Sequence, residues 1–122
     1  MIKKVNSLRP IERIKKNSEF RIVLGRGERV ESDNLTFYFA ENRLGFSRIG
    51  LSLSKKTGNA VKRNRIKRLV REVFRRQKKR FKDGYDIVVI CRRALPEIKL
   101  TQMETIFNSA LSKSKILPEE NF

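Results

Sequence analysis

The segment from Lys55 to Lys82 limits what this chain can fold into and bind more than any other part of the sequence. It contains 14 of the 30 Lys and Arg residues and a single acidic residue, Glu72, so it carries a net charge of +13 in a chain whose total is +17. Its apolar residues recur at helical spacing, and they are Ile66, Leu69, Val70, Val73 and Phe74. This stripe predicts an amphipathic helix that buries one face and turns its cationic side chains to solvent.

The cationic face of this predicted helix is typical of a surface that binds polyanions. Solvent-exposed helices usually alternate the sign of their charges to gain pairs four residues apart, and here we expect only Arg68 and Glu72 to form one. Guanidinium groups also match phosphate oxygens in a bidentate geometry that an ammonium group cannot reproduce. We therefore expect this face to bind nucleic-acid phosphates.

The composition of the chain argues against several classes of functional site. It has 122 residues, no histidine and a single cysteine, Cys91. Without histidine the commonest catalytic base is missing and a zinc site of Cys and His ligands cannot form, and one cysteine cannot make an internal disulfide. The acidic residues are scattered without ligand spacing, so we predict no catalytic residue and no metal ion bound by protein side chains.

Length and hydropathy indicate how such a protein is organised and where it works. We expect 1–122 to form a single nucleic-acid-binding domain with mobile tails at 1–10 and 119–122. No apolar run reaches membrane-spanning length, and the first residues lack the apolar core of a secretory signal. The lone cysteine agrees with a reducing compartment. We therefore expect a cytoplasmic protein with no membrane association and no disulfide-linked partner.

The first half of the chain predicts a helix followed by strands. Asn17 is a candidate cap for a helix that ends near Gly25 and Gly27. Alternating apolar residues then predict strands over 34–40 and 48–54, which we expect to pair as an antiparallel hairpin. Val30 either begins the first of these strands or pairs just before it.

The second half continues with the basic helix, another strand and a last helix. We expect a cap at Asn59 and a basic helix that runs to about Lys79. The nearly continuous apolar run 85–91 predicts a strand in the interior of a sheet, and Thr101 is a candidate cap for a helix that Pro118 stops. The order α-β-β-(β)-α-β-α, in which the bracketed strand is short, indicates an α+β sandwich of a small mixed sheet with packed helices.

The stretch Gly50–Glu72 is similar to the signature of bacterial ribonuclease P protein subunits. It reads GLSLSKKTGNAVKRNRIKRLVRE, and the family's basic motif is matched by Arg63-Asn64-Arg65, followed at the usual spacing by Lys67-Arg68 and Arg71-Glu72. Weaker similarities extend over nearly the whole chain, at 15–20, Phe37-Tyr38, 86–89 and Cys91-Arg92. Leu24 departs from the pattern, because family members often have an aromatic residue at this place in the first helix.

The resemblance implies an accessory protein of a catalytic RNA. In that family the RNA cleaves precursor tRNA to make the mature 5′ end, using bound magnesium, and the protein has no activity alone. The protein binds the catalytic RNA through its basic helix and the loop before it, which here contain Lys55, Lys56, Asn59, Lys62, Arg63, Asn64, Arg65, Lys67, Arg68, Arg71 and Arg75. The resemblance also implies a left-handed β-α-β crossover around this helix.

A second implied site is a cleft between the first helix and the sheet that holds the 5′ leader of precursor tRNA. The residues support such a groove independently. Tyr38 alternates with two phenylalanines, so its ring is expected to leave the core face and to be free to stack on a base. Ser52 and Ser54 share the polar face of their strand. Phe20 is either a second stacking platform or a core aromatic, and the sequence leaves both alternatives open.

Composition alone leaves other functions open, and the main alternative is a ribosomal-type structural RNA-binding protein without a role in processing. Only the signature within 58–72 separates the two. The missing histidine and the scattered acidic residues disfavour a nuclease with its own active site. The predicted strands, and the lack of a second short helix before the basic one, disfavour a helix-turn-helix DNA-binding protein.

Overall fold

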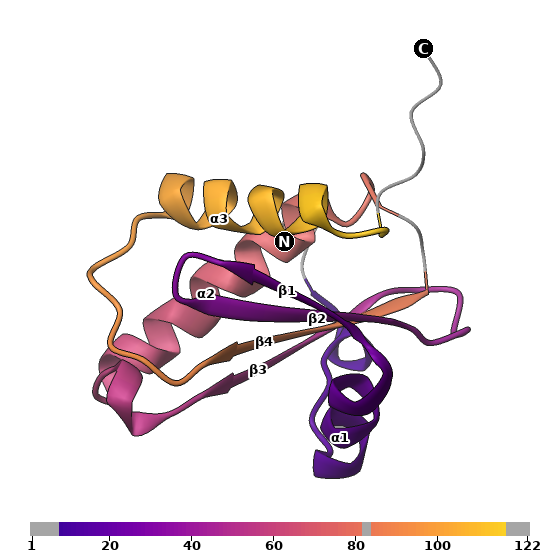
Figure 1. Ribbon diagram of the computed structural model, residues 1–122, viewed down its shortest axis with the longest axis horizontal. Coiled ribbons are helices and arrows are strands. Elements are labelled where there is room, and N and C mark those ends of the chain that lie inside the picture. The colour runs from indigo at the N-terminus through magenta and orange to yellow at the C-terminus, as the bar shows by residue number, and fades with distance from the viewer. Residues whose placement is uncertain (1–7, 82–83, 117–122) are drawn as a thin grey trace, which may run out of the picture.

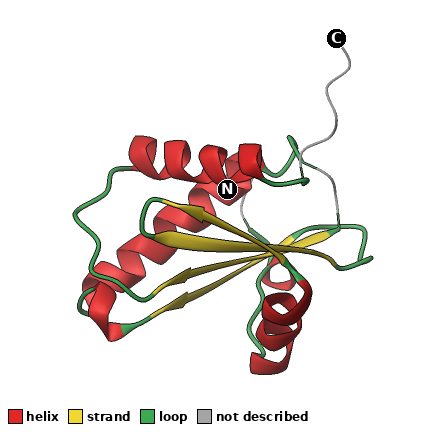
Figure 2. Ribbon diagram, viewed as in Figure 1, coloured by secondary structure: helices red, strands yellow, loops and turns green. Residues whose placement is uncertain are grey.

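A computed structural model describes residues 8–81 and 84–116, so most of the expected tails and the expected helix stop at Pro118 lie outside the described residues. The α+β class and the predicted order of elements, including the short extra strand, are confirmed (Figure 1 and Figure 2). In chain order the elements are η1 (Pro10–Glu12), α1 (Asn17–Arg26), β1 (Glu28–Ser32), β2 (Leu35–Glu41), β3 (Arg48–Leu53), η2 (Lys55–Thr57), α2 (Ala60–Gln77), β4 (Tyr85–Cys91) and α3 (Leu100–Lys113).

The four strands form one mixed sheet in the order β1-β2-β4-β3. β2 pairs antiparallel with β1 and β4, whereas β3 pairs parallel with β4. The predicted hairpin between 34–40 and 48–54 is therefore wrong. The hairpin is β1–β2, and its turn contains Asp33, whose positive φ of 53° suits a tight hairpin. β4 lies between β2 and β3 because its almost wholly apolar sequence requires burial on both faces, which only a central strand provides.

α2 connects the parallel neighbours β3 and β4. In the view of Figure 1 both strands point the same way, β4 lies above β3 and α2 passes behind the sheet, so this β-α-β crossover is left-handed. Crossovers of this type are right-handed in about 98% of cases. The hand implied by the family resemblance is thus the observed one, and no local pattern would have predicted it.

The helices cover the two faces of the sheet unequally. α2 and α3 pack on one face, where the main core contains the fully buried rings of Phe37, Phe74 and Phe107. α1 lies on the opposite face and covers only part of it (Figure 1). There the alternate strand residues and α1 form a second, smaller cluster of buried side chains, which are Ile14, Val23, Ala40 and Val88. The uncovered part of this face is open to a ligand.

The predicted helix caps are only partly correct. Asn59 does cap α2, because its side-chain oxygen accepts a hydrogen bond from the backbone N–H of Lys62 at 2.9 Å. Asn17 and Thr101 do not cap, since they lie inside the first turns of α1 and α3, whose N-caps are Lys16 and Lys99. Residue types favoured as caps also occur within first turns, so the residue pattern alone leaves the boundary uncertain by a residue or two.

Candidate nucleic-acid interface

α2 has the two faces expected from its sequence. Its apolar stripe is buried in the main core or packed against it, at Ile66, Leu69, Val70, Val73 and Phe74. The expected RNA-binding residues on this helix are all exposed or half-buried, and they are Lys62, Arg63, Asn64, Arg65, Lys67, Arg68, Arg71 and Arg75. One surface of the molecule therefore carries a concentrated positive charge on a rigid helix.

The acidic residue of this helix pairs differently from the expectation. Glu72 accepts hydrogen bonds from Arg75 and Arg76, with a distance of 2.8 Å between its Oε2 and Arg76 Nε, and it does not bind Arg68. A carboxylate placed four residues before a cation is the favourable orientation on a helix, and Glu72 with Arg76 satisfies it. Arg68 has no side-chain partner in the described part of the chain and is free to bind a ligand.

Two other guanidinium groups of α2 lack hydrogen-bond acceptors. The Nε atoms of Arg63 and Arg71 are buried and have no partner among the described residues. Burial lowers the pKa of Arg71, and the nearby positive charge of Arg13 lowers it further. Arg13 comes from the segment before α1, which pairs with Ile49 at the free edge of β3. A phosphate bound here would supply both the missing acceptor and the missing negative charge.

The loop before α2 is held against the end of β4. The backbone N–H of Ser54 and the buried hydroxyl of Thr57 both donate to the carbonyl of Cys91, at 3.0 and 3.2 Å. The ammonium groups of Lys55 and Lys56 are exposed beside this anchor. The tether therefore holds two further cations close to the N-terminal end of α2.

The first turns of α2 also contact the segment after β4. Lys62 Nζ donates to the carbonyl of Leu95, and Arg65 Nη1 lies 3.2 Å from Glu97 Oε1. The Arg65 side chain is 45% exposed and that of Glu97 81% exposed. Such a surface pair contributes little to stability, so Arg65 can exchange Glu97 for a phosphate at low cost.

The register of the strands places the second candidate site on the face of the sheet opposite the main core. One row of neighbours across β2, β4 and β3 consists of Tyr38, Val88 and Gly50, and the next row consists of Thr36, Ile90 and Ser52. Tyr38 and Ile90 pack against the smaller cluster and remain partly exposed. Ser54 follows β3, and its buried Oγ has no partner among the described residues. Tyr38 and Ser52 thus share a partly open surface.

Phe20 of α1 lies over the row that contains Tyr38. Its ring is half-buried, packs against the smaller cluster and rests on Gly50, where an added Cβ would lie 2.9 Å from Phe20 Cζ. Phe20 is therefore a packing element that is not fully buried, and its role as a stacking platform stays a prediction.

An ion-pair network joins α1 to the sheet. Arg48 donates to both carboxylate oxygens of Asp86, at 2.8 and 2.7 Å, and its Nη1 donates to Glu19 of α1 at 2.8 Å. The hydrogen bond with Asp86 is the first cause of the raised pKa of Arg48. Asn42 also donates to Asp86 at 2.7 Å. This network fixes the position of the helix that carries Phe20.

The described residues contain no cluster of three or more His, Cys, Asp and Glu side chains that could hold a metal ion. No described helix combines the length and apolarity needed to cross a bilayer. Cys91 is buried on β4, and its thiol is free. The interface therefore consists of cations, hydroxyl groups and aromatic rings.

Comparison with known proteins shows which family this chain belongs to. The family model described as Ribonuclease P matches residues 8–115. The chain belongs to the ribonuclease P protein family. The ribonuclease P protein component of Pelotomaculum thermopropionicum is 36% identical over 109 residues, which are 89% of this chain and 97% of that protein. That of Syntrophus aciditrophicus is 46% identical over 86 residues, which are 70% of this chain and 72% of that protein.

Solved structures of ribonuclease P proteins have the same fold. The Staphylococcus aureus RNase P protein superposes with a TM-score of 0.78 at 34% identity, covering 88% of this chain and 98% of that one. The RNase P protein of Thermotoga maritima superposes with a TM-score of 0.75 at 30% identity, covering 85% of this chain and 98% of that one. At both of these sequence identities, the shared fold indicates common ancestry.

Sequence reasoning missed two arginines that the ribonuclease P fold of this chain places beside the candidate sites. One is Arg13, next to Arg71. The other is Arg29, the cross-strand neighbour of Tyr38. The alternation within β1, in which Val30 is buried and Arg29 exposed, could have shown which face Arg29 occupies. Its neighbour could not have been identified, because that depends on the register between β1 and β2.

Proposed function

We propose that this chain is the protein subunit of a ribonuclease P enzyme. It binds the catalytic RNA through α2 and the loop before it, and it binds the 5′ leader of precursor tRNA on the open face of the sheet. In this way it assists endonucleolytic removal of the leader to give the mature 5′ end. Membership in the family supports the assignment to ribonuclease P. The two surfaces described above support separate binding sites for the catalytic RNA and for the leader.

The electrostatics of α2 support its role in binding the catalytic RNA. Arg68 has no partner among the described residues, and Arg63 and Arg71 have buried Nε atoms without acceptors. Such cations repel one another until phosphates neutralise them, and each neutralised phosphate releases counterions from the RNA. Binding to a polyanion therefore relieves a cost that the free protein carries.

The sheet face supports binding of a single strand. The ring of Tyr38 is partly exposed, its neighbour Val88 lies in the same row, and Ser52 offers a hydroxyl in the next row. Aromatic rings stack on any base, so a surface of this kind holds leaders of different sequence. Phe20 is half-buried beside the same surface and packs on Gly50.

The proposal assigns no bond-breaking step to the chain itself. We assign the magnesium ions of the reaction to the catalytic RNA and the substrate, because Mg²⁺ keeps several waters and is bound mainly through phosphate oxygens in sites of this kind. The chain purified free of RNA should leave precursor tRNA uncleaved, and we place the assembled enzyme in the cytoplasm. Site-specific 5′ processing by the RNA-free chain would contradict this assignment.

The observation that supports the leader site most directly is the position of Tyr38 on the face away from the main core. Tyr38→Ala should weaken binding of precursor tRNA by the assembled enzyme roughly 5- to 150-fold, since base stacking is worth about 1–3 kcal/mol. Mature tRNA, which has no leader, should bind almost unchanged. Tyr38→Phe keeps the ring and is the matched control. Equal losses for both RNAs would rule out the leader site.

A second measurement separates this function from that of a structural RNA-binding protein. A cognate catalytic RNA would be assayed on precursor tRNA at low magnesium, with and without the chain. The protein subunit of ribonuclease P should raise the cleavage rate under these conditions, because its cations replace part of the screening that magnesium provides. A protein that binds the RNA but leaves the rate unchanged would fit the structural alternative.

A further inference from the structure

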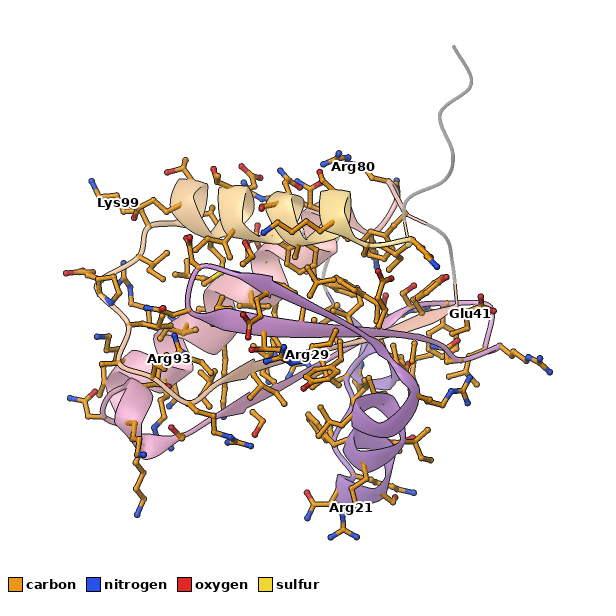
Figure 3. The ribbon with its side chains drawn as sticks, in the orientation of Figure 1. Arg21, Arg29, Glu41, Arg80, Arg93 and Lys99 are labelled. Carbon is orange, nitrogen blue, oxygen red and sulfur yellow. The ribbon has the colours of Figure 1, made fainter. Side chains whose placement is uncertain are left out.

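A pocket of about 200 Å³ lies at the end of the sheet face that α1 leaves uncovered. The β1–β2 hairpin forms one side of it and the segment after β4 forms the other. Its lining includes three arginines, Arg29, Arg92 and Arg93, and two residues of the sheet face, Thr36 and Ile90. Figure 3 shows Arg29 and Arg93 on their separate elements. Residues 63 positions apart in the chain thus meet around one opening.

This pocket is continuous with the surface around Tyr38. Arg29 is the cross-strand partner of Tyr38, and Thr36 pairs with Ile90 in the adjoining row. Successive rows on one face of a sheet are two residues apart along each strand, which is roughly 7 Å. A nucleotide strand whose base stacks on Tyr38 therefore has a neighbouring phosphate within reach of the pocket.

The arginines of the pocket have few acidic partners among the described residues. Arg92 and Arg93 are exposed, and their side chains have no hydrogen bond or ion pair with the described residues. Arg29 Nη2 lies 2.6 Å from Glu31 Oε1, but both side chains are more than half exposed. The pKa of Arg29 is raised, first by its side-chain interaction with Tyr38 and then by Glu31. An exposed pair of this kind is weak, so a stronger anion can displace Glu31.

We propose that Arg29, Arg92 and Arg93 bind one backbone phosphate of the leader, next to the nucleotide that stacks on Tyr38. This deepens the proposed function and rests on it. Guanidinium groups suit a phosphate because they donate paired hydrogen bonds in a planar fork. Arg29 lies on an edge strand beside the stacking ring, so it fixes the path of the strand as it leaves Tyr38.

Glu31 and Asp33 are the two carboxylates of the pocket. The proposal therefore predicts opposite effects on leader binding when an arginine and when a carboxylate of the pocket is neutralised. Glu31 competes with the phosphate for Arg29. Loss of the Glu31 charge should therefore tighten binding of the leader, whereas loss of the Arg29 charge should weaken it. If Arg29 and Glu31 had no contact with the leader, neutralising them would not change the affinity for precursor tRNA in opposite directions.

The test is a scan of the leader with the assembled enzyme. Precursor tRNAs would be made with a neutral methylphosphonate in place of one leader phosphate at a time. In the wild-type enzyme, one substitution should weaken binding about 3- to 10-fold beyond its neighbours. Arg29→Gln should weaken binding of the unmodified RNA by a similar factor and should remove the sensitivity to that one position. Its salt slope should fall by about 0.7.

Each change of charge in the pocket has a control variant with the same change of charge on the opposite side of the sheet. Arg80→Gln and Glu104→Gln, near the end of α2 and on α3, should reproduce any effect of net charge alone and should not alter the phosphate scan. Glu31→Gln should tighten binding of precursor tRNA more than Glu104→Gln does, and it should leave mature tRNA unchanged.

The outcomes distinguish this inference from the proposed function. If Tyr38→Ala discriminates precursor from mature tRNA but Arg29→Gln weakens every methylphosphonate RNA by the same factor, the leader site stands and the phosphate pocket is wrong. Identical effects of Glu31→Gln and Glu104→Gln on the affinity for precursor tRNA would also show that the pocket does not bind a leader phosphate. If Tyr38→Ala shows no discrimination, the leader site fails, and the pocket fails with it.

Discussion

The ring of Phe20 rests on the backbone of Gly50, and this contact sets how closely α1 approaches the sheet. A Cβ at position 50 would lie 2.9 Å from Phe20 Cζ and 3.0 Å from Phe20 Cε1, closer than side chains pack. Because Gly50 is the neighbour of Val88 in the row that contains Tyr38, the same contact places the two aromatic rings on one surface. A missing side chain on β3 therefore shapes the proposed leader site.

Gly50→Ala should displace Phe20 and destabilise the protein. Overpacking of a close contact typically costs about 1–3 kcal/mol, and the displaced ring should also weaken binding of precursor tRNA. Gly25→Ala is the matched control, because a Cβ there meets nothing within 4 Å and the residue lies inside α1. The control should gain about 0.5–1 kcal/mol. Urea denaturation measures both changes, and a Gly50→Ala protein as stable as the wild type would contradict the close contact.

The network around Arg48 should contribute strongly to stability. The side chains of Arg48 and Asp86 are only 14% and 8% exposed, so removal of one leaves the other charge buried without its partner. We expect Arg48→Met to lower the free energy of unfolding by about 2–4 kcal/mol. Arg65→Met, which breaks the exposed pair with Glu97, should cost less than about 1 kcal/mol. Comparable losses in thermal or chemical denaturation would show that the network is not a structural anchor.

Glu12 should make stability depend on pH in the acidic range. Its side chain is buried, and although burial raises its pKa, hydrogen bonds from Lys78 Nζ and the backbone N–H of Arg9, both at 2.8 Å, hold the pKa below its ordinary value of 4.5. A lowered pKa in the folded state stabilises the protein above the unfolded pKa, and this stabilisation is lost as the pH falls through the folded value.

The test compares Glu12→Gln with the wild type over that range. The variant should be about 1–3 kcal/mol less stable at pH 7, and the difference should shrink as the pH falls below about 4.5. Glu104→Gln removes a carboxylate without a hydrogen-bond partner among the described residues, so its effect should stay small throughout. A Glu12→Gln difference that stays constant from pH 7 to acid would argue against a role for the ionised carboxylate.

Arg68 should contribute to RNA binding without contributing to folding. Arg68→Gln should weaken binding of the catalytic RNA and lower the dependence of log K on log salt by about 0.7–0.9, which is the loss of one phosphate contact. The melting temperature should be unchanged, because the side chain is exposed and has no partner in the described part of the chain. Arg80→Gln serves as the control for net charge. An unchanged salt slope in Arg68→Gln would remove this residue from the interface.

Some of this architecture could be predicted because it depends on neighbours in the sequence. The buried stripe of α2 follows from helical periodicity, and the Asn59 cap follows from a side chain that reaches a backbone N–H three residues away. The alternation in β2 likewise predicted that Tyr38 turns away from Phe37 and Phe39. Similarity of 50–72 to a known family added the function, which periodicity does not contain.

Only the tertiary structure decided which elements become neighbours. The predicted β2–β3 hairpin was wrong because β4, which follows later in the chain, lies between them and buries both of its faces there. Arg29 beside Tyr38, and Arg13 beside Arg71, depend on strand register and on the path of the segment before α1. The sequence by itself determined which side chains face the core or solvent, because that depends on local periodicity. Which exposed side chains converge on one surface depends on contacts between distant segments, and these are decided by competition for burial across the whole fold.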